Sequence, residues 1–333
     1  NYLNVTNNFD QNSNLQARST RTGTLTVELI NVVTETTSYE VKCTITATAV
    51  ERTSSNNETV PTPVIKEYRT LKATRSTDTT MFRSSTYKEK IKIITFEDEI
   101  NIRDNKIEEW DISEEQDNSI IAYVTPNEDD STYYDLYIQS DKIIAANKDM
   151  SYWFIGLLYV DSINGLELLD TSMTTNMGYM FYGTGYSSPN FILDVSNFDT
   201  SNVTDMSGMF NSVGYNSNKF ALDVSNFDTS KVTDMKKMFY NTGYSSTIFT
   251  LDVSNFDTSK VTDMSFMFYN VGYSNSKFTL DVTNFDTSKV TDMRSMFYYT
   301  GCINSNFRLD ISNFDTSNVT NMSHMFEGTG RSS

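Results

Sequence analysis

The segment LDVSNFDTSKVTDMKKMFYNTGYSS, residues 222–246, decides the fold, because close copies of it recur along the second half of the chain. Its opening heptad returns every 29 residues with at most one substitution, starting at Leu193, Leu222, Leu251, Leu280 and Leu309. A degenerate earlier copy, LELLDTSMTTNMGYMF, surrounds Asp170. A fixed period of this length predicts a solenoid whose units bury apolar surface against their neighbours. We therefore expect six stacked copies over residues 164–333.

Within one unit, the apolar pattern changes from strand spacing to helix spacing. Leu222 and Val224 alternate with polar residues, which predicts a short strand with one face inward. A turn-forming run, NFDTS, follows at residues 226–230. Apolar residues then recur at helical spacing, so we expect about two turns of helix capped by Thr233 or Asp234. These apolar residues are Val232, Met235, Met238 and Phe239.

A glycine follows the expected helix in every copy, where a left-handed residue often ends a helix. The glycines are Gly185, Gly214, Gly243, Gly272, Gly301 and Gly330. Stacking also places equivalent side chains of successive copies in columns. We expect apolar columns containing Leu222, Phe227 and Met235, and an asparagine ladder containing Asn226.

The unit resembles the repeat of BspA-like leucine-rich-repeat surface proteins. The family signature DTSxVTDMxxMF stands here nearly unchanged, as at residues 228–239, and the similarity covers residues 164–333. The resemblance implies an α+β, β-rich protein with a leucine-rich-repeat-like solenoid, one short parallel strand and one short helix in each unit. It also implies a bacterial cell-surface protein used in adhesion. The added GYSSxxFT-type stretch lengthens the unit, and this departure from the family pattern is expected to fall in the loops of the convex side.

The first half of the chain reads as three segments. Residues 1–20 are polar and are expected to form a flexible or extended segment. Residues 21–85 are interpreted as a small β domain, because residues 24–33 and 38–50 alternate like two strands of a hairpin. Residues 86–163 are interpreted as a mixed β cap of the solenoid.

Within the cap and just before it, further strands are expected at residues 65–71, 89–96, 119–124, 133–139 and 142–145. The last two are expected to form a hairpin, and residues 110–113 a turn. The apolar segment 150–158 is expected to cover the open end of the first repeat, as solenoids require.

The composition excludes several classes of function. A net charge of −17 argues against nucleic acid and against docking on anionic membranes. A single histidine, His324, excludes a Ser-His-Asp triad and multi-histidine metal sites. No apolar run approaches the roughly 18 residues of a membrane-spanning helix.

Cys43 and Cys302 are expected to be unpaired. The start at Asn1 is typical of a processed or truncated chain.

Two aspartate columns are candidates for an ion site. One contains Asp194, Asp223, Asp252, Asp281 and Asp310. The other contains Asp199, Asp228, Asp257, Asp286 and Asp315. Stacked carboxylates repel unless they bind a cation or accept local hydrogen bonds. We expect local turns and caps, and hence no metal or cofactor, with a calcium ladder on the second column as the alternative.

Tyrosine columns are the better candidates for binding, because a tyrosine offers both an apolar face and a hydroxyl. The candidate interaction surface consists of Tyr182, Tyr240, Tyr269 and Tyr298 together with Tyr186, Tyr215, Tyr244 and Tyr273. The alternative is that these rings only pad one side of the solenoid. The most variable positions, 207–208, 236–237, 265–266, 294–295 and 323–324, are expected to face solvent.

The last unit offers a candidate assembly edge. No polar capping repeat follows it before Ser333, so Phe307, Leu309 and Ile311 are expected to lie on an unpaired edge open to self-association.

We therefore expect a non-catalytic, extracellular or cell-surface protein that mediates adhesion to a protein or glycan. It is not expected to bind nucleic acid or to insert into a membrane. Two alternatives remain open. One is a structural subunit of an extracellular filament, pilus-like appendage or surface layer, and the other is a calcium-dependent polysaccharide-binding module.

Overall fold

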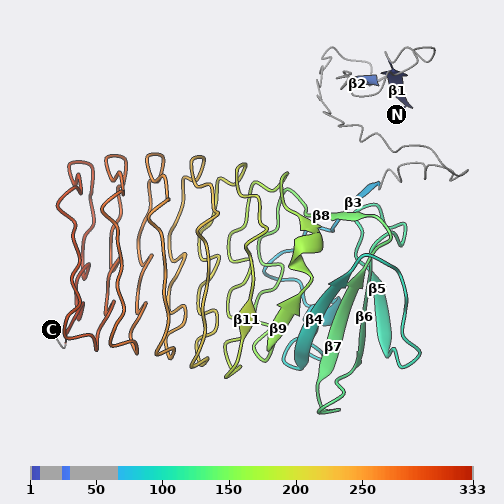
Figure 1. Cartoon of the computed structure of the whole chain (residues 1–333), viewed down its shortest axis with the longest axis horizontal. Helices are drawn as coiled ribbons and strands as arrows, with labels where there is room; N and C mark the ends of the chain where they lie inside the picture. Colours follow the sequence, from blue (N-terminus) through green and yellow to red (C-terminus); the bar gives the residue numbers. More distant parts are fainter. Residues whose placement is uncertain (1, 8–24, 31–66, 332–333) are drawn as a thin grey trace, which may run out of the picture. The chain divides into compact units, whose positions relative to one another are not determined.

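The structure, a computed structural model, describes residues 2–7, 25–30 and 67–331 (Figure 1). The chain divides into two compact units, Asn1–Val64 and Ile65–Ser333. In the first unit, β1 (Tyr2–Asn7) pairs antiparallel with β2 (Leu25–Ile30). β2 lies within an expected strand, and β1 lies in the segment expected to be flexible or extended. The expected strand at residues 38–50 lies outside the described residues.

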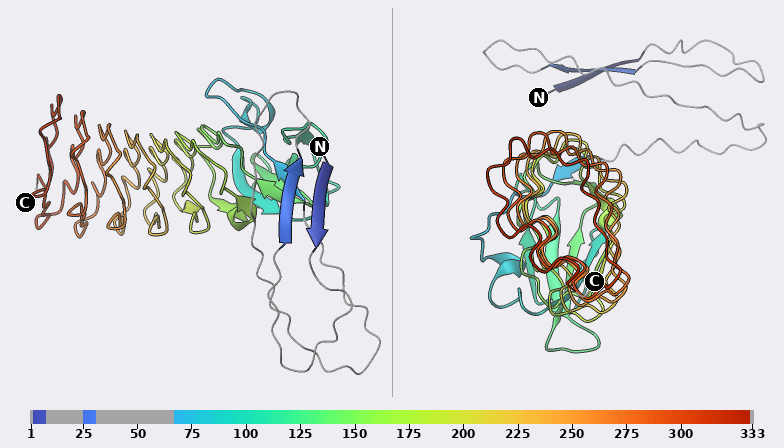
Figure 2. Two further views of the ribbon diagram at one scale, coloured as in Figure 1. Left: turned by 90° about the horizontal axis from the view of Figure 1, so that it is seen from above. Right: turned by 90° about the vertical axis from the view of Figure 1, so that its left-hand side faces the viewer.

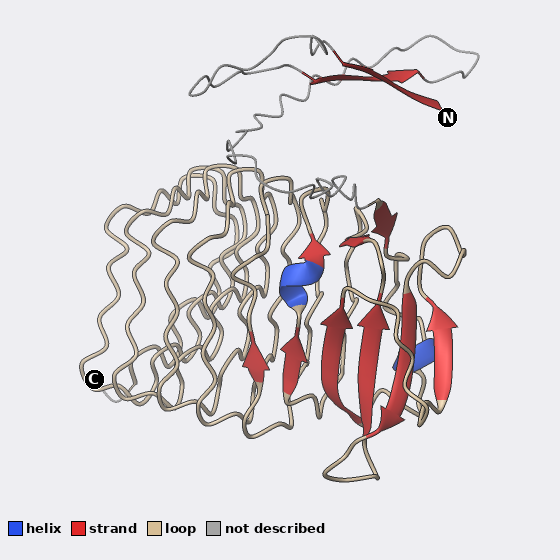
Figure 3. Ribbon diagram, turned by 45° about the vertical axis from the view of Figure 1, so that its right-hand side comes forward, coloured by secondary structure: helices blue, strands red, loops and turns tan. Residues whose placement is uncertain are grey.

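A six-stranded mixed sheet occupies one end of the second unit, in the order β11-β9-β4-β7-β6-β5 (Figure 3). The strands from β11 to β7 run parallel, and β6 is antiparallel to both β7 and β5. The bounds are β4 Ile91–Glu97, β5 Glu108–Asp111, β6 Ile121–Pro126, β7 Tyr134–Gln139, β9 Ser162–Asn164 and β11 Ile192–Leu193. β4, β6 and β7 confirm three expected strands.

A second, parallel sheet has the order β10-β8-β3. Its strands are β3 Tyr68–Thr70, β8 Ile143–Ala145 and β10 Leu169–Asp170. The hairpin expected from residues 133–139 and 142–145 is wrong, because β7 and β8 pair in different sheets. The expected turn at residues 110–113 is also wrong at its start, where Trp110 belongs to β5 and pairs with Ala122. Since β3 joins β8, the compact unit begins earlier than the expected cap boundary at residue 85.

The repeats lie side by side as a stack of coils, which overlay closely when seen along the stack (Figure 2). Parallel bridges join equivalent residues of neighbouring coils, such as Asp205, Asp234 and Asp263. On this side, alternate N–H groups donate to the next coil: Met206 to the Asp234 carbonyl at 3.1 Å, and Phe210 to the Met238 carbonyl at 2.9 Å. We call the run equivalent to residues 205–213 in each coil the ribbon.

The expectation of one helix in each repeat is wrong. Within the described residues, helix is limited to the two short 3-10 turns η1 (Met81–Arg83) and η2 (Leu166–Leu168). In the ribbon, Lys237 and Asn241 have φ of +57° and +55°, which no right-handed helix accommodates. The N–H groups between those that bond to the next coil close tight turns, as Met238 does to the Met235 carbonyl at 3.1 Å. Asp234 caps no helix but accepts the N–H of Lys236 at 2.9 Å.

The strand side of each coil keeps the expected alternation without a continuous ladder. Leu222 and Val224 are buried, whereas Ala221 and Asp223 are exposed. Beyond β11, however, no strand is assigned within the described part of the repeats. The two sheets and the parallel bridges between coils make the second unit β-rich, as expected. The short strand expected in each unit does not recur in every copy.

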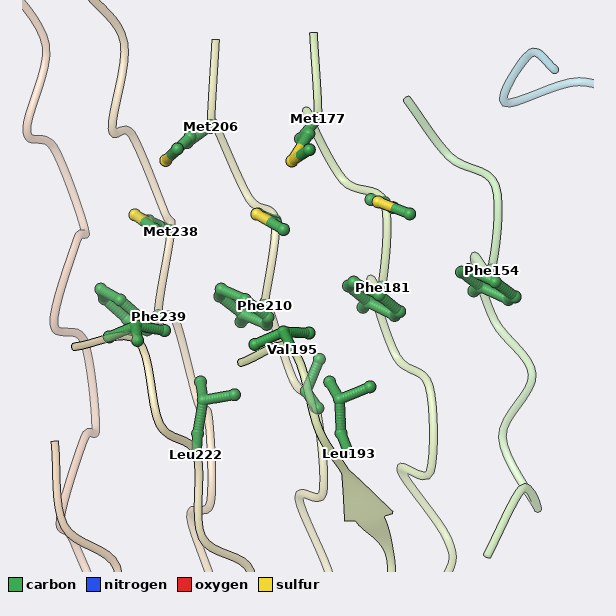
Figure 4. Packing of buried hydrophobic residues seen from close by; sticks show 14 of the residues in the cluster. Phe154, Met177, Phe181, Leu193, Val195, Met206, Phe210, Leu222, Met238 and Phe239 are labelled. Carbon is green, nitrogen blue, oxygen red and sulfur yellow. The ribbon is translucent and has the colours of Figure 1, made fainter. Parts of the chain in front are cut away.

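The core consists of columns that run through the stack (Figure 4). Phe210 stacks on Phe181 at 5.9 Å and on Phe239 at 5.8 Å, with ring planes within 7° of parallel. The expected leucine and methionine columns are buried through Leu280 and Met293, and become more exposed in the last coil. Because these side chains are buried between coils, each unit depends on its neighbours for its stability.

The segment before the repeats covers the first coil, as expected. Phe154 stacks on Phe181 at 5.2 Å, and the N–H of Phe154 donates to the Met180 carbonyl at 2.8 Å. Asp149 also bridges Asn176, so this segment is itself a coil of the ribbon.

The glycine that follows the ribbon has the left-handed backbone expected for it. Gly243 has φ of +58°, and a Cβ there would lie 2.7 Å from a ring carbon of Phe249. The same positive φ occurs in all six copies. Glycine is required because both the backbone and the adjacent ring exclude a side chain.

Candidate interaction surface

The expected tyrosine columns form two stacks of rings. In the first, Tyr269 lies 4.4 Å from Tyr240 and 4.4 Å from Tyr298, centroid to centroid, with ring planes within 14° of parallel. The second stack comprises Tyr186, Tyr215, Tyr244 and Tyr273, at 4.5 to 4.7 Å. These rings are half-buried, whereas Tyr182 is 41% exposed.

Stacking changes what these columns present to a partner. Both faces of an inner ring such as Tyr269 lie against other rings, so only ring edges and hydroxyls remain accessible. Burial, together with a hydrogen bond to Tyr273, raises the pKa of Tyr244 well above its ordinary value. Burial and the neighbouring tyrosines raise the pKa of Tyr269 in the same direction. Tyr244 and Tyr269 therefore offer neutral hydroxyls at physiological pH.

Backbone hydrogen bonds hold the first tyrosine stack in register. The N–H of Ser212 donates to the Tyr240 carbonyl at 2.7 Å, and the N–H of Asn241 donates to the Tyr269 carbonyl at 2.8 Å. One coil earlier, the N–H of Gly183 donates to the Asn211 carbonyl at 2.8 Å. Asn211 therefore occupies a tyrosine position in this column but carries no ring.

The second stack ends differently. Its next position is Cys302, a buried free thiol. The ring of Tyr299 lies 6.1 Å from Tyr273, at an angle of 31°. A ring from a neighbouring column thus continues this stack where its own tyrosine is missing. Cys43 lies outside the described residues.

The variable ribbon positions do not all face solvent. Ser207, Ser265 and Ser295 are buried, so the expectation is wrong for them: a short side chain does not extend beyond its larger neighbours. The larger residues are half-buried and interact with each other. Phe266 lies 4.9 Å from the guanidinium of Arg294 and 5.6 Å from the ammonium of Lys237.

Aromatic and cationic groups therefore meet on one side of the ribbon, next to the first tyrosine stack. Phe266 also contacts Tyr240 edge-on at 6.3 Å. Aromatic side chains and arginine are the residue types enriched at protein interfaces.

The aspartate columns make local hydrogen bonds. Asp228 accepts the N–H of Ser230 at 2.9 Å, and Asp223 accepts that of Ser225 at 2.9 Å. Hydrogen bonds from these serines, side chain first and backbone second, lower the pKa of both carboxyls. Every member of both columns accepts the N–H two residues later in the same way. Within residues 67–331, no group of three or more His, Cys, Asp and Glu side chains is arranged to hold a metal ion.

A shallow groove that the sequence analysis did not anticipate crosses the strand side. It has a volume of about 450 Å³, and Ala221, Thr250 and Thr279 line it beside Asp223 and Asp252. The sequence does contain a sign of this groove at the outward strand position. The middle copies carry small residues there, whereas the second and last coils carry Ile192 and Arg308.

The candidate assembly edge is only partly open. Phe307 is buried against Phe278 at 6.1 Å, whereas Leu309 and Ile311 are half-buried. The more exposed apolar groups of this coil lie on its ribbon, where Met322 is 48% exposed and Phe326 is 45% exposed.

Comparison with known proteins identifies one family. Residues 148–279 and 270–331 match DUF285, a family described as Mycoplasma protein of unknown function. No curated protein and no solved structure shows significant similarity to the chain. Within the described residues, none of the helices has the length and apolar character needed to span a bilayer. The match begins where the ribbon begins, next to Asp149, and spans more than half of the sequence, so the chain belongs to the DUF285 family.

Proposed function

We propose that this chain is a non-catalytic repeat protein of the cell surface that mediates adhesion by binding a protein or glycan. The observation that carries the proposal is the contrast between the core of the stack and one of its sides. The core columns hardly change from coil to coil, whereas the ribbon positions next to the first tyrosine stack change in size and charge. A scaffold that repeats its interior and varies one face is suited to recognition.

We further propose that the repeat belongs to the BspA-like leucine-rich-repeat type, in a form that replaces the helix of each unit with the ribbon. The near-identical DTSxVTDMxxMF signature supports this assignment. The same carboxylates recur in every coil with the same local hydrogen bonds, whereas acid–base catalysis needs carboxyl groups in different environments. This regularity supports a binding role over an enzymatic one.

The experiment is an adhesion assay with beads that carry the full chain, added to monolayers of epithelial cells. In the test variant, Lys237→Ser and Arg294→Ser remove both cations around Phe266 and install serine, which other copies carry at these positions. In the matched control, Lys231→Asn and Lys260→Asn change the net charge equally on another side of the coil, and other copies carry asparagine there. Reduced adhesion of the test variant alone supports the proposal. Equal adhesion by beads without protein contradicts it.

A second candidate function is a structural subunit of an extracellular filament or layer. The way in which coils cover each other favours it, because Met293 and Phe297 are fully buried by the next coil, and coils of two chains would bury such groups in the same way. Sedimentation of the full chain over a wide concentration range tests this alternative. Self-association that disappears in the Met322→Ser, Phe326→Ser double variant supports it, and a monomer at all concentrations contradicts it.

A further inference from the structure

The groove on the strand side reaches the backbone between neighbouring coils. Its outer lining consists of the outward side chains of Ala221, Thr250 and Thr279. Leu222 and Leu251 also line it, although their side chains belong to the core and are at most 6% exposed. An adjoining hollow of about 300 Å³ shares Ala221 with the groove and extends it to β11. A ligand in this groove therefore meets main-chain atoms as well as side chains.

The main-chain donors and acceptors along the groove lack partners. In each of three neighbouring coils, the N–H and carbonyl groups of the outward residue and its two successors make no hydrogen bond within residues 67–331. These residues are Ala221, Leu222 and Asp223, then Thr250, Leu251 and Asp252, then Thr279, Leu280 and Asp281. Main-chain polar groups away from bulk water are nearly always paired in native proteins. The groove therefore favours a ligand that brings both donors and acceptors.

The groove also carries negative charge that no basic residue of its lining neutralises. Asp223, Asp252 and Asp281 line it, and Lys219 belongs only to the adjoining hollow. Within residues 67–331, none of the three aspartates forms an ion pair. Hydrogen bonds from Ser254 lower the pKa of Asp252, and the charge of Asp223 opposes this shift. The carboxylates are therefore ionised at neutral pH and repel each other along the column.

These features together select one class of ligand. A metal ion satisfies carboxylates and carbonyls, but it brings no acceptor for the N–H groups. A neutral glycan brings donors and acceptors but no positive charge. An extended peptide rich in lysine or arginine brings all three, because its main chain carries an N–H and a carbonyl at each residue and its alternate side chains point to the same face.

We propose that the groove along residues 221–223, 250–252 and 279–281 binds an extended, lysine- or arginine-rich segment of a partner protein. The main chain of the segment bonds to the unpaired N–H and carbonyl groups, and its cationic side chains pair with the aspartates. This inference names a partner class for the proposed adhesion role and rests on that role for its biological meaning.

The test is a fluorescence anisotropy titration of the full chain with a fluorescein-labelled octapeptide of alternating lysine and threonine. We expect saturable binding that weakens as salt is added, and no binding of the matching peptide of alternating glutamate and threonine. The double variant Asp223→Asn, Asp252→Asn removes two charges but keeps the oxygens that accept the N–H groups of Ser225 and Ser254. We expect this variant to stay folded and to bind roughly ten-fold more weakly.

The matched control is the double variant Asp228→Asn, Asp257→Asn. It makes the same change in net charge and keeps the same local hydrogen bonds, but these two aspartates do not line the groove. We expect its binding to stay within about two-fold of that of the unmodified chain. Thr250→Arg places in the middle of the groove the residue type that Arg308 supplies at this position in the last coil. Its bulk and charge are expected to weaken binding at least as much as the test variant does.

Three results overturn the inference. The first is an absence of saturable binding by the unmodified chain. The second is equal weakening by the two double variants, which shows that the peptide responds to net charge alone. The third is unchanged binding by Thr250→Arg, which places the peptide elsewhere. Circular dichroism checks that each variant is folded. The bead assay changes ribbon residues and uses no peptide, so its outcome separates failure of the proposed function from failure of this site.

Discussion

The hydroxyl of Thr200 and the backbone of Asp228, one coil further on, exchange two hydrogen bonds. Oγ1–H of Thr200 donates to the Asp228 carbonyl at 3.0 Å, and the N–H of Asp228 donates to Oγ1 at 2.8 Å. Thr171 and Asp199 repeat the arrangement. One buried hydroxyl thus fixes the register of neighbouring coils on this side, as the hydrogen bonds of a strand ladder do in a sheet.

Replacing Thr200 with valine keeps the shape of the side chain and removes both hydrogen bonds. We expect a loss of about 1–3 kcal/mol in the free energy of unfolding, because the Asp228 N–H and carbonyl remain partly buried without this partner. Urea denaturation followed by circular dichroism measures it. Thr250→Val, at an exposed outward position, is the matched control and should change stability little. Equal losses in the two variants would contradict the register role.

The asparagine ladder gives a second prediction. Nδ2 of Asn255 donates to the carbonyls of Ser225 at 2.7 Å and Phe227 at 3.2 Å. Asn255→Asp replaces this donor with a carboxylate facing two carbonyl oxygens, so we expect a lower melting temperature at pH 7 than at pH values near its pKa, where protonation restores a donor. Asn218→Asp makes the same charge change at an exposed position and should melt like the unmodified chain.

Gly243 provides a third prediction. Gly243→Ala forces a Cβ into a left-handed backbone and against Phe249, so we expect a loss of at least about 1–2 kcal/mol. Gly178→Ala, where the backbone φ is not positive, should cost less. Thermal melting of the two variants compares them directly, and a similar fall in both would show that the left-handed backbone at Gly243 is not the cause.

Acid sensitivity is the fourth prediction. Hydrogen bonds from Ser259, side chain first, lower the pKa of Asp257 in the folded state. The pKa is lowered in the same way at Asp194, Asp223, Asp228, Asp252, Asp281, Asp286, Asp310 and Asp315. A lowered pKa contributes stability above the unfolded value, near 3.9, and this stability is lost as the pH falls through the folded value. We expect the melting temperature to be steady near neutrality and to fall below about pH 4. Asp257→Asn should make that fall shallower.

The sequence predicts the columns of the core better than the path of the backbone between them. Met235, Met238 and Phe239 are buried as expected, because burial follows from their spacing. That spacing also fits a ribbon with one left-handed residue in every four, and nothing in the identities of Lys237 or Phe266 signals a positive φ. A helix makes its hydrogen bonds within one unit, whereas the ribbon makes them between residues 28 apart, such as Met206 and Asp234, and a local pattern does not show such distant partners.

The candidate surface, too, could be predicted from the sequence only in part. The tyrosine columns are evident in the sequence, and so is Asn211 as the member without a ring. The sequence does not show that the rings of Tyr240 and Tyr269 stack on each other. Because of this stacking, a partner can reach the ring edges and hydroxyls but not the ring faces between them.

The constant hydrogen-bond offset along the ribbon also bears on how such a gene evolves. Losing a single codon inside a coil misaligns the donors and acceptors on either side of the deletion, whereas losing or gaining a whole unit brings equivalent surfaces back together. Recombination between the near-identical repeats therefore lengthens or shortens the stack by whole coils. The same event changes which side chains, such as Lys237 or Phe266, stand next to each other on its outer side.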